Sequence, residues 1–164
     1  MARQASDAAL LERIARADDG ALAELYDRYG GSAYALALRI LGDPARAAAA
    51  VESAFSVTWR SPGSSLGRQA GTQSWILSLV HRRTIELLRR EWPSPADRIA
   101  RLAKARADAR GEAAAAGHPA TEQALRRLPR EQREVLELAY YAGLTESELA
   151  EWLDQPATRP PFPA

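Results

Sequence analysis

The chain has 164 residues, enough for one ordinary domain or two small helical ones, and 46% of them are apolar, so we expect a packed core. It has no cysteine and only two histidines, which excludes disulfides and thiolate metal sites and leaves too few ligands for a zinc site. No apolar run is long enough to cross a membrane and no charged-then-apolar leader is seen, so we expect a cytoplasmic protein without membrane insertion.

The formal net charge of +1 conceals an uneven distribution of charge. Between Ser74 and Arg110 there are nine basic side chains and four acidic ones, whereas between Thr121 and Glu151 there are seven glutamates and four arginines. Such asymmetry favours one surface that faces a polyanion over a uniformly basic protein.

Helical spacing of apolar residues dominates the first half of the chain, and strand signals are nearly absent. We expect Asp7 to cap a first helix, and a second helix to begin near Ala21 and continue through Ile40 with a bend at Gly30-Gly31. The run Gly42-Asp43-Pro44 ends that helix and starts a third, because Asp is a good cap and Pro suits the first turn. The pattern predicts that the third helix extends to about Arg60 and that a fourth covers residues 72–91.

Prolines 93 and 95 interrupt the helical pattern, and the Ala- and Arg-rich residues 93–119 are predicted to form a partly helical linker. After it, one stripe of a further helix is formed by Leu128, Gln132, Val135, Leu136 and Ala139, with Pro129 at its first turn. Gly143 ends this helix, and Thr145 with Glu148 predicts a capping box for the next one.

Several segments resemble conserved regions of bacterial sigma factors of the extracytoplasmic-function (ECF) group. The second conserved region is matched by LYDRYGGSAYALALRILGDPARA, AFSVTWR and SWILSLVHRRTIELLRR, and the start of the fourth region by LRRLPREQREVLELAYYAGLTESELAEWL. The resemblance implies an all-α protein with a region 2-like helical domain (1–92), a linker (93–119), a region 4-like partial helix-turn-helix (120–155) and a Pro-rich tail (156–164).

In that family, the first domain binds the clamp helices of core RNA polymerase and helps to open the promoter, and the second reads the upstream promoter element. The resemblance therefore implies that the fourth helix contacts promoter DNA through Trp75, His81, Arg82, Arg83, Arg89 and Arg90. Guanidinium groups would hold phosphates, and the two rings would stack on bases or meet their edges. The alternative is a solvated, partly charge-balanced helix face with Trp75 in the core.

The resemblance places polymerase binding on the third helix, at Glu52, Phe55 and Trp59. The family pattern of the type E-D-x-x-Q-E-x-F is replaced here by AAAVESAF, residues 48–55, so most of its polar side chains are absent. Loss of several polar contacts, each of about 1 kcal/mol, would weaken binding by orders of magnitude. The alternative reading is that Phe55 and Trp59 belong to the core.

A helix-turn-helix reads DNA with its second helix, yet residues 157–164 of this chain, ATRPPFPA, contain three prolines. An interior proline costs a helix about 3 kcal/mol, so we expect upstream readout to be lost. A shifted reading frame near Gln155 and a genuine short form both explain this segment. Loss of the packing partner would leave Val135, Leu136, Leu149 and Trp152 partly exposed.

The sequence thus predicts a sigma factor-like transcription initiation protein with core RNA polymerase and promoter DNA as partners. The alternative is a regulatory interaction protein, a decoy that binds an anti-sigma factor or polymerase without starting transcription. No nucleophile–base constellation, phosphate-binding glycine loop or metal cluster is seen, so an enzyme, a cofactor, a metal and a small-molecule substrate are not expected.

Overall fold

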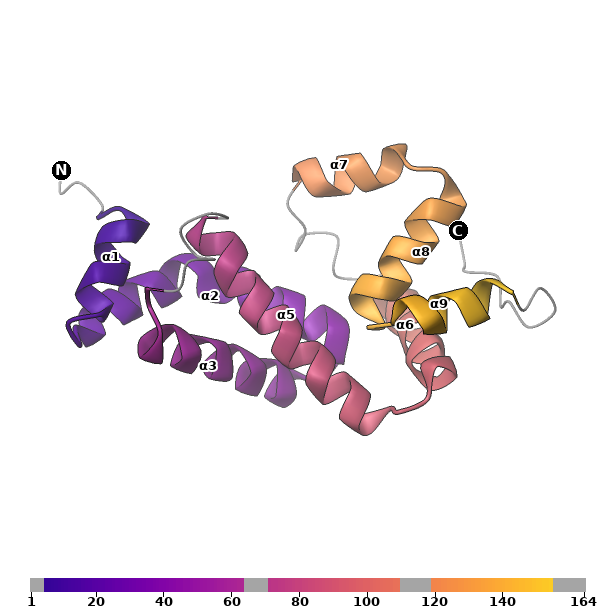
Figure 1. Ribbon diagram of the computed structural model, residues 1–164, viewed down its shortest axis with the longest axis horizontal. Coiled ribbons are helices and arrows are strands. Elements are labelled where there is room, and N and C mark those ends of the chain that lie inside the picture. The colour runs from indigo at the N-terminus through magenta and orange to yellow at the C-terminus, as the bar shows by residue number, and fades with distance from the viewer. Residues whose placement is uncertain (1–4, 64–70, 110–118, 155–164) are drawn as a thin grey trace. The chain divides into compact units, whose positions relative to one another are not determined.

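The computed structural model describes residues 5–63, 71–109 and 119–154, and every regular element in these ranges is a helix (Figure 1). The expected all-α fold is therefore confirmed. The helices are α1 (Asp7–Ile14), α2 (Asp19–Leu41), α3 (Pro44–Arg60), α5 (Thr72–Glu91), α6 (Pro95–Ala109), α7 (Pro119–Arg127), α8 (Arg130–Tyr141) and α9 (Glu146–Leu153). The chain divides into two compact units, residues 1–84 and 85–164, so α5 contributes its first part to one and its end to the other.

Short polar side chains set the starts of the first three helices. The Ser6 hydroxyl, and not Asp7, caps α1 by accepting a hydrogen bond from the Ala9 N–H at 3.3 Å, which leaves Asp7 in the first turn. Asp43 caps α3 by accepting from the Arg46 N–H at 2.9 Å, with Pro44 in the first position, as predicted. The long helix α2 runs through both of the paired glycines without interruption.

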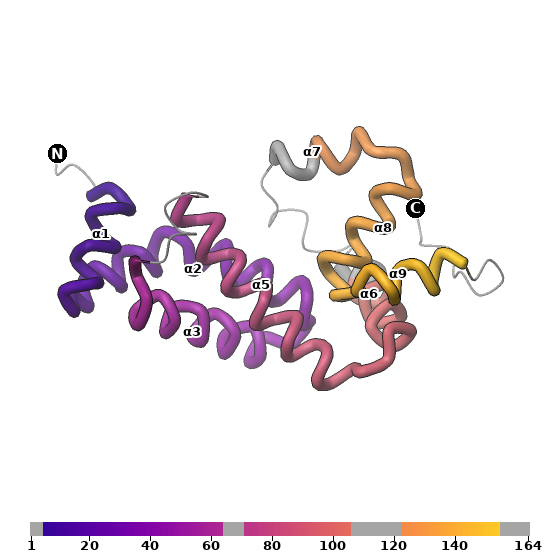
Figure 2. The backbone as a smooth tube through the Cα atoms, viewed as in Figure 1, coloured from indigo at the N-terminus to yellow at the C-terminus, as the bar shows by residue number. Residues whose placement is uncertain are grey.

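Small residues let α2 and α3 pack closely side by side in the first unit (Figure 2). Six alanines in these two helices are at most 2% exposed: Ala21, Ala33 and Ala37 in α2, and Ala47, Ala50 and Ala54 in α3. Larger side chains complete this core, among them Leu10, Leu25, Leu41, Val51, Ile76 and Val80. The Ala-rich composition therefore has a packing role in this unit, because alanine adds apolar contact without bulk.

In the second unit, part of the predicted linker is an ordered helix. Residues 95–109 form α6, and its Ile99 and Leu102 are buried in one cluster with Leu138, Ala142 and Leu144. Tyr141, Leu149 and Trp152 pack against this cluster. The helix that links the two sequence regions is thus a structural part of the second unit.

Four apolar side chains of the second unit were expected to be partly exposed, and the structure agrees in part. Leu136 is 49% exposed, whereas Val135, Leu149 and Trp152 are half-buried. The Pro-rich residues 156–164, and with them the predicted loss of the reading helix, lie outside the described residues. None of the described helices is long and apolar enough to cross a membrane, and the described residues contain no cluster of potential metal ligands.

Candidate polymerase and nucleic-acid interfaces

A groove of about 890 Å³ lies between α2 and α3 in the first unit. Its α2 wall is formed by Asp19, Leu22 and Tyr26, and its α3 wall by Ala48, Glu52, Phe55, Ser56, Trp59 and Arg60. The three residues that the sequence predicts as polymerase-binding, Glu52, Phe55 and Trp59, therefore line one concavity. Their spacing along α3 explains this, because residues three, four and seven apart share one face of a helix.

The two aromatic residues of this predicted set are largely packed, as the core reading expects. Phe55 is 5% exposed, and its ring meets that of Tyr26 edge-on with 4.9 Å between the centroids. Trp59 is half-buried, and Glu52 is exposed at the groove. The two alanines that replace polar family residues, Ala48 and Ala49, are exposed, whereas Ala50, where the family pattern specifies no residue, is buried. The polar groups of the α3 wall are thus the Glu52 carboxylate, the Ser56 hydroxyl and the Arg60 guanidinium.

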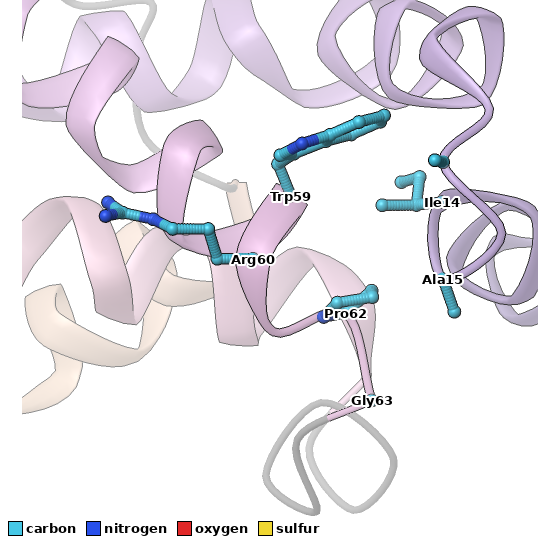
Figure 3. A pocket seen from close by; sticks show the side chains of 7 residues that line it. Ile14, Ala15, Trp59, Arg60, Pro62 and Gly63 are labelled. Atoms are coloured by element: carbon cyan, nitrogen blue, oxygen red, sulfur yellow. The ribbon is translucent and has the colours of Figure 1, made fainter.

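A second cavity of about 380 Å³ adjoins the end of α3, and it shares Trp59 and Arg60 with the groove. Figure 3 shows the Trp59 side chain projecting from α3 toward Ile14 of α1, while Arg60 points away from it. Ala17, in the turn after α1, also lines this cavity and has a left-handed backbone with φ of 62°. The Trp59 side chain therefore lines both the groove and this second cavity at the end of α1.

The first half of α5 places the predicted DNA-binding residues in different environments. Trp75 is 4% exposed, so its ring belongs to the core and is not available to stack on a base. Arg82 is exposed, and His81 and Arg83 are half-buried. Of these four residues, Arg82 offers the most accessible charge for a phosphate.

The end of α5 lies in the second unit, where the two predicted arginines differ. Arg89 donates from Nε and Nη2 to the Gly143 carbonyl oxygen at 3.1 and 2.5 Å and lies 3.7 Å from the Glu148 carboxylate. Arg90 is 70% exposed and pairs with Glu86 one turn earlier, at 3.1 Å. Arg89 is therefore engaged in structure, and Arg90 in a solvent-exposed pair of the kind that contributes little to stability.

The turn between α8 and α9 is held by a second arginine that the sequence analysis did not single out. Arg98 of α6 is 2% exposed and donates to the carbonyl oxygens of Ala142, Trp92 and Pro93 at 3.0, 3.0 and 2.7 Å. It also pairs with Glu148 at 2.8 Å. Four partners for one guanidinium satisfy the rule that a buried charge is paired and hydrogen-bonded.

The same turn fixes the start of α9. Thr145 and Glu148 form the predicted capping box, with bonds of 3.2 and 2.8 Å between each side chain and the other's backbone N–H. Gly143 has a φ of 62°, and a Cβ atom there would lie 2.8 Å from Cγ2 of Ile85 on α5. Only glycine meets both conditions, so this turn and the end of α5 approach closely.

Comparison with known proteins identifies the family. The sigma-70 region 4 family matches residues 119–158, which include α7, α8 and α9. The ECF RNA polymerase sigma factor SigK of Mycobacterium sp. (strain KMS) is 31% identical over 150 residues, covering 88% of this chain and 77% of that protein. The protein of the same name from Mycobacterium tuberculosis (strain ATCC 25618 / H37Rv) is 31% identical over 148 residues, covering 87% and 79%.

The chain belongs to the ECF group of RNA polymerase sigma factors. Its role is therefore in transcription initiation, and the family consists of transcription regulators and not of enzymes. The resemblance inferred from sequence motifs is confirmed. In this sigma factor, α8 and α9 lie in the segment that matches region 4, and the buried Arg98 holds the turn between them.

Sequence reasoning missed Arg98, Gly143 and Tyr26 as residues that shape these surfaces. Arg98 reads as one more cation in a basic segment, since nothing in its neighbours signals burial. The sequence did predict that Gly143 ends a helix. Its close approach to Ile85 depends on tertiary packing and could not be predicted. Tyr26 lies in the matched segment LYDRYGGSAYALALRILGDPARA without an assigned contact, although it is 49% exposed beside the groove.

Proposed function

We propose that this sigma factor binds core RNA polymerase through the groove between α2 and α3. The observation that carries the proposal is that Glu52, Phe55 and Trp59, assigned to polymerase from sequence motifs, line this one groove in a confirmed member of the family. The groove offers apolar and aromatic walls for a partner helix. Two carboxylates, from Asp19 and Glu52, favour basic side chains on that helix.

Promoter DNA is the second partner in this proposal, through the exposed face of α5. Arg82 and Arg90 are exposed there, with His81 and Arg83 half-buried beside them, and guanidinium groups suit phosphate contacts. Trp75 is not included because it is buried, and Arg89 is not included because it holds the Gly143 carbonyl group. Upstream-element readout is absent in this proposal, since four prolines among residues 156–164 oppose a reading helix there.

The test is titration of core RNA polymerase with the purified chain, followed by promoter opening with the resulting complex. The expected result is saturable binding that is weakened by Glu52→Ala, and open-complex formation without dependence on an upstream element. Absence of binding at micromolar concentration would overturn the proposal. Ala45→Ser, at an exposed position on the same helix that does not line the groove, is the matched control and should leave the affinity unchanged.

A decoy is the second candidate function, and the alanines of α3 favour it. The exposed Ala48 and Ala49 stand where the family carries polar contact residues, so an interaction with polymerase or with an anti-sigma factor without initiation is compatible with the groove. A decoy would bind its partner yet give no transcript from any promoter when core enzyme is added. Run-off transcription from promoter libraries therefore separates the two functions.

A further inference from the structure

Tyr26 is an exposed aromatic residue on the α2 wall of the groove, opposite the residues that the motifs assign to polymerase. It is 49% exposed, although its ring packs edge-on against Phe55 with an interplanar angle of 61°. Leu22, one helical turn earlier, lines the same wall. Tyr26 is thus about half exposed and lines the groove while its ring also contacts Phe55.

The neighbouring turn of α2 explains why the ring lies where it does. Gly30, four residues after Tyr26, is buried, and a Cβ atom at this position would lie 3.1 to 3.2 Å from Cε1, Cδ1 and Cζ of the Tyr26 ring. Such a separation is shorter than ordinary van der Waals contact between carbon atoms, so the ring would have to shift. The adjacent Gly31 differs, because a Cβ atom there has nothing within 4 Å. Gly30 therefore provides the space that the Tyr26 ring occupies.

An aromatic ring that is already held in place is well suited to binding a partner. Contacts with Phe55 and with the backbone at Gly30 limit the ring before any partner arrives, so little side-chain entropy is lost on association. Tyrosine is also enriched among the residues that dominate the free energy of protein interfaces. On the facing wall, Ala48 has no polar group to contribute, so the aromatic wall carries more of the interaction.

We propose that Tyr26 is a principal contact residue for core RNA polymerase and that Gly30 is a positioning residue that acts through it. The proposal rests on the proposed function, since it names residues of the same groove. The partner surface is a helix of the polymerase with apolar side chains for the rings of Tyr26 and the half-buried Trp59. Basic side chains on that helix would meet the carboxylates of Asp19 and Glu52.

The first experiment titrates core RNA polymerase with full-length variants at the contact residue. Tyr26→Ala should weaken binding about 10- to 30-fold, as expected for a central aromatic contact. Tyr26→Phe should keep most of the affinity, because the ring and not the hydroxyl makes the contact. Equal losses in both variants, or unchanged affinity of Tyr26→Ala, would overturn the assignment.

The second experiment separates positioning from simple stability. Gly30→Ala should weaken polymerase binding by about 3- to 10-fold, and Gly31→Ala, the matched control on the same helix, should leave the affinity unchanged. In a Tyr26→Ala background, Gly30→Ala should have no further effect, because its action passes through the ring. An equal loss from Gly30→Ala in both backgrounds would show that Gly30 acts in another way.

Failure of this proposal is distinguishable from failure of the proposed function. If the unmodified chain does not bind core RNA polymerase, the groove assignment itself is wrong. If the unmodified chain binds and Tyr26→Ala binds equally well, polymerase binding stands and the Tyr26 contact is wrong. Thermal unfolding of every variant, monitored by circular dichroism, ensures that a lost interaction is not a lost fold.

Discussion

Arg98 shows how a residue that counts as surface charge in the sequence becomes central to a fold. Its guanidinium is 2% exposed, and it joins two carbonyl groups before α6, one at the end of α8 and the carboxylate of Glu148. The Ala142 carbonyl group belongs to a buried residue, and a buried acceptor left without a donor costs about 1–3 kcal/mol. One side chain therefore ties α6 to the turn between α8 and α9.

Replacing Arg98 by alanine should destabilise the second unit by about 3–5 kcal/mol, because it removes a buried guanidinium that is the donor to the Ala142 carbonyl group and an ion-pair partner of Glu148. Chemical denaturation followed by circular dichroism measures the change. Lys104→Ala, at an exposed position of the same helix, should change stability by less than about 0.5 kcal/mol. Equal denaturation midpoints for the two variants would show that Arg98 does not stabilise the turn between α8 and α9.

Ala17 has a backbone conformation that is unfavourable for a residue other than glycine. Its φ of 62° lies in the left-handed region, which disfavours a residue with a Cβ atom by roughly 1–2 kcal/mol. Ala17→Gly should therefore stabilise the first unit by up to about 1 kcal/mol, even though glycine loses more entropy on folding. The control, Ala23→Gly at an exposed position inside α2, should destabilise by about 0.5–1 kcal/mol. In thermal unfolding, Ala17→Gly should raise the melting temperature and Ala23→Gly should lower it. A change in the same direction for both variants would contradict the strain at Ala17.

Local signals were readable from the sequence, and long-range partnerships were not. The cap at Asp43, the capping box of Thr145 and Glu148, and the limits of α3 and α5 all follow from neighbours within one turn, and the structure confirms them. The role of Arg89 depends on Gly143, which is 54 residues away. No pattern along α5 distinguishes Arg89 from Arg90, because only tertiary packing decides which guanidinium meets a carbonyl group.

Among the helices, α6 is the one whose packing was least evident from its amino-acid composition. An Ala- and Arg-rich segment with two large apolar residues has helix propensity but too little apolar surface to indicate a packing face by itself. Ile99 and Leu102 become buried because α8 and the turn after it supply Leu138, Ala142 and Leu144. The partly helical character of this segment was predicted, and what the sequence did not show is the packing through which its neighbours stabilise it.

The start of α9 gives a prediction about pH. Burial by itself raises the pKa of the Glu148 carboxyl, but the N–H of Thr145 and the Arg98 guanidinium outweigh it and lower the pKa below 4.5, with Arg89 adding to the effect. A lowered pKa means that the ionised form stabilises the fold above the unfolded-state pKa, and that this stabilisation is lost as the pH falls below about 4.5.

Glu148→Gln tests that prediction, because glutamine keeps the capping box and removes the charge. The difference in unfolding free energy between the unmodified chain and the variant should be largest at neutral pH and should shrink below about pH 4.5. Denaturation at a series of pH values measures it. A difference that does not depend on pH would show that the charge of Glu148 is not what stabilises the turn. Glu146→Gln, an exposed residue of the same turn, is the control.

For the molecule as a whole, the basic surface is smaller than the sequence suggests. Nine basic residues lie between Ser74 and Arg110, but Arg98 is buried, Arg89 holds a carbonyl group and Arg101 lies 4.1 Å above the Trp92 ring. On α5, Arg82 and Arg90 stay exposed, and Arg90 has Glu86 beside it. Few phosphates can therefore be met at one time by this helix.

The affinity for DNA should consequently depend only modestly on salt. Two to three phosphate contacts give a slope of about −2 to −3 in a plot of log affinity against log salt concentration, since each contributes about −0.9. Arg82→Ala should make the slope shallower by about 1 without changing thermal stability, whereas Arg89→Ala should lower thermal stability and leave the slope unchanged. Fluorescence anisotropy with duplex DNA at several salt concentrations measures the slopes. A slope near zero, or the same response from both variants, would remove α5 from the DNA interface and leave the groove of α2 and α3 as the surface through which this sigma factor acts.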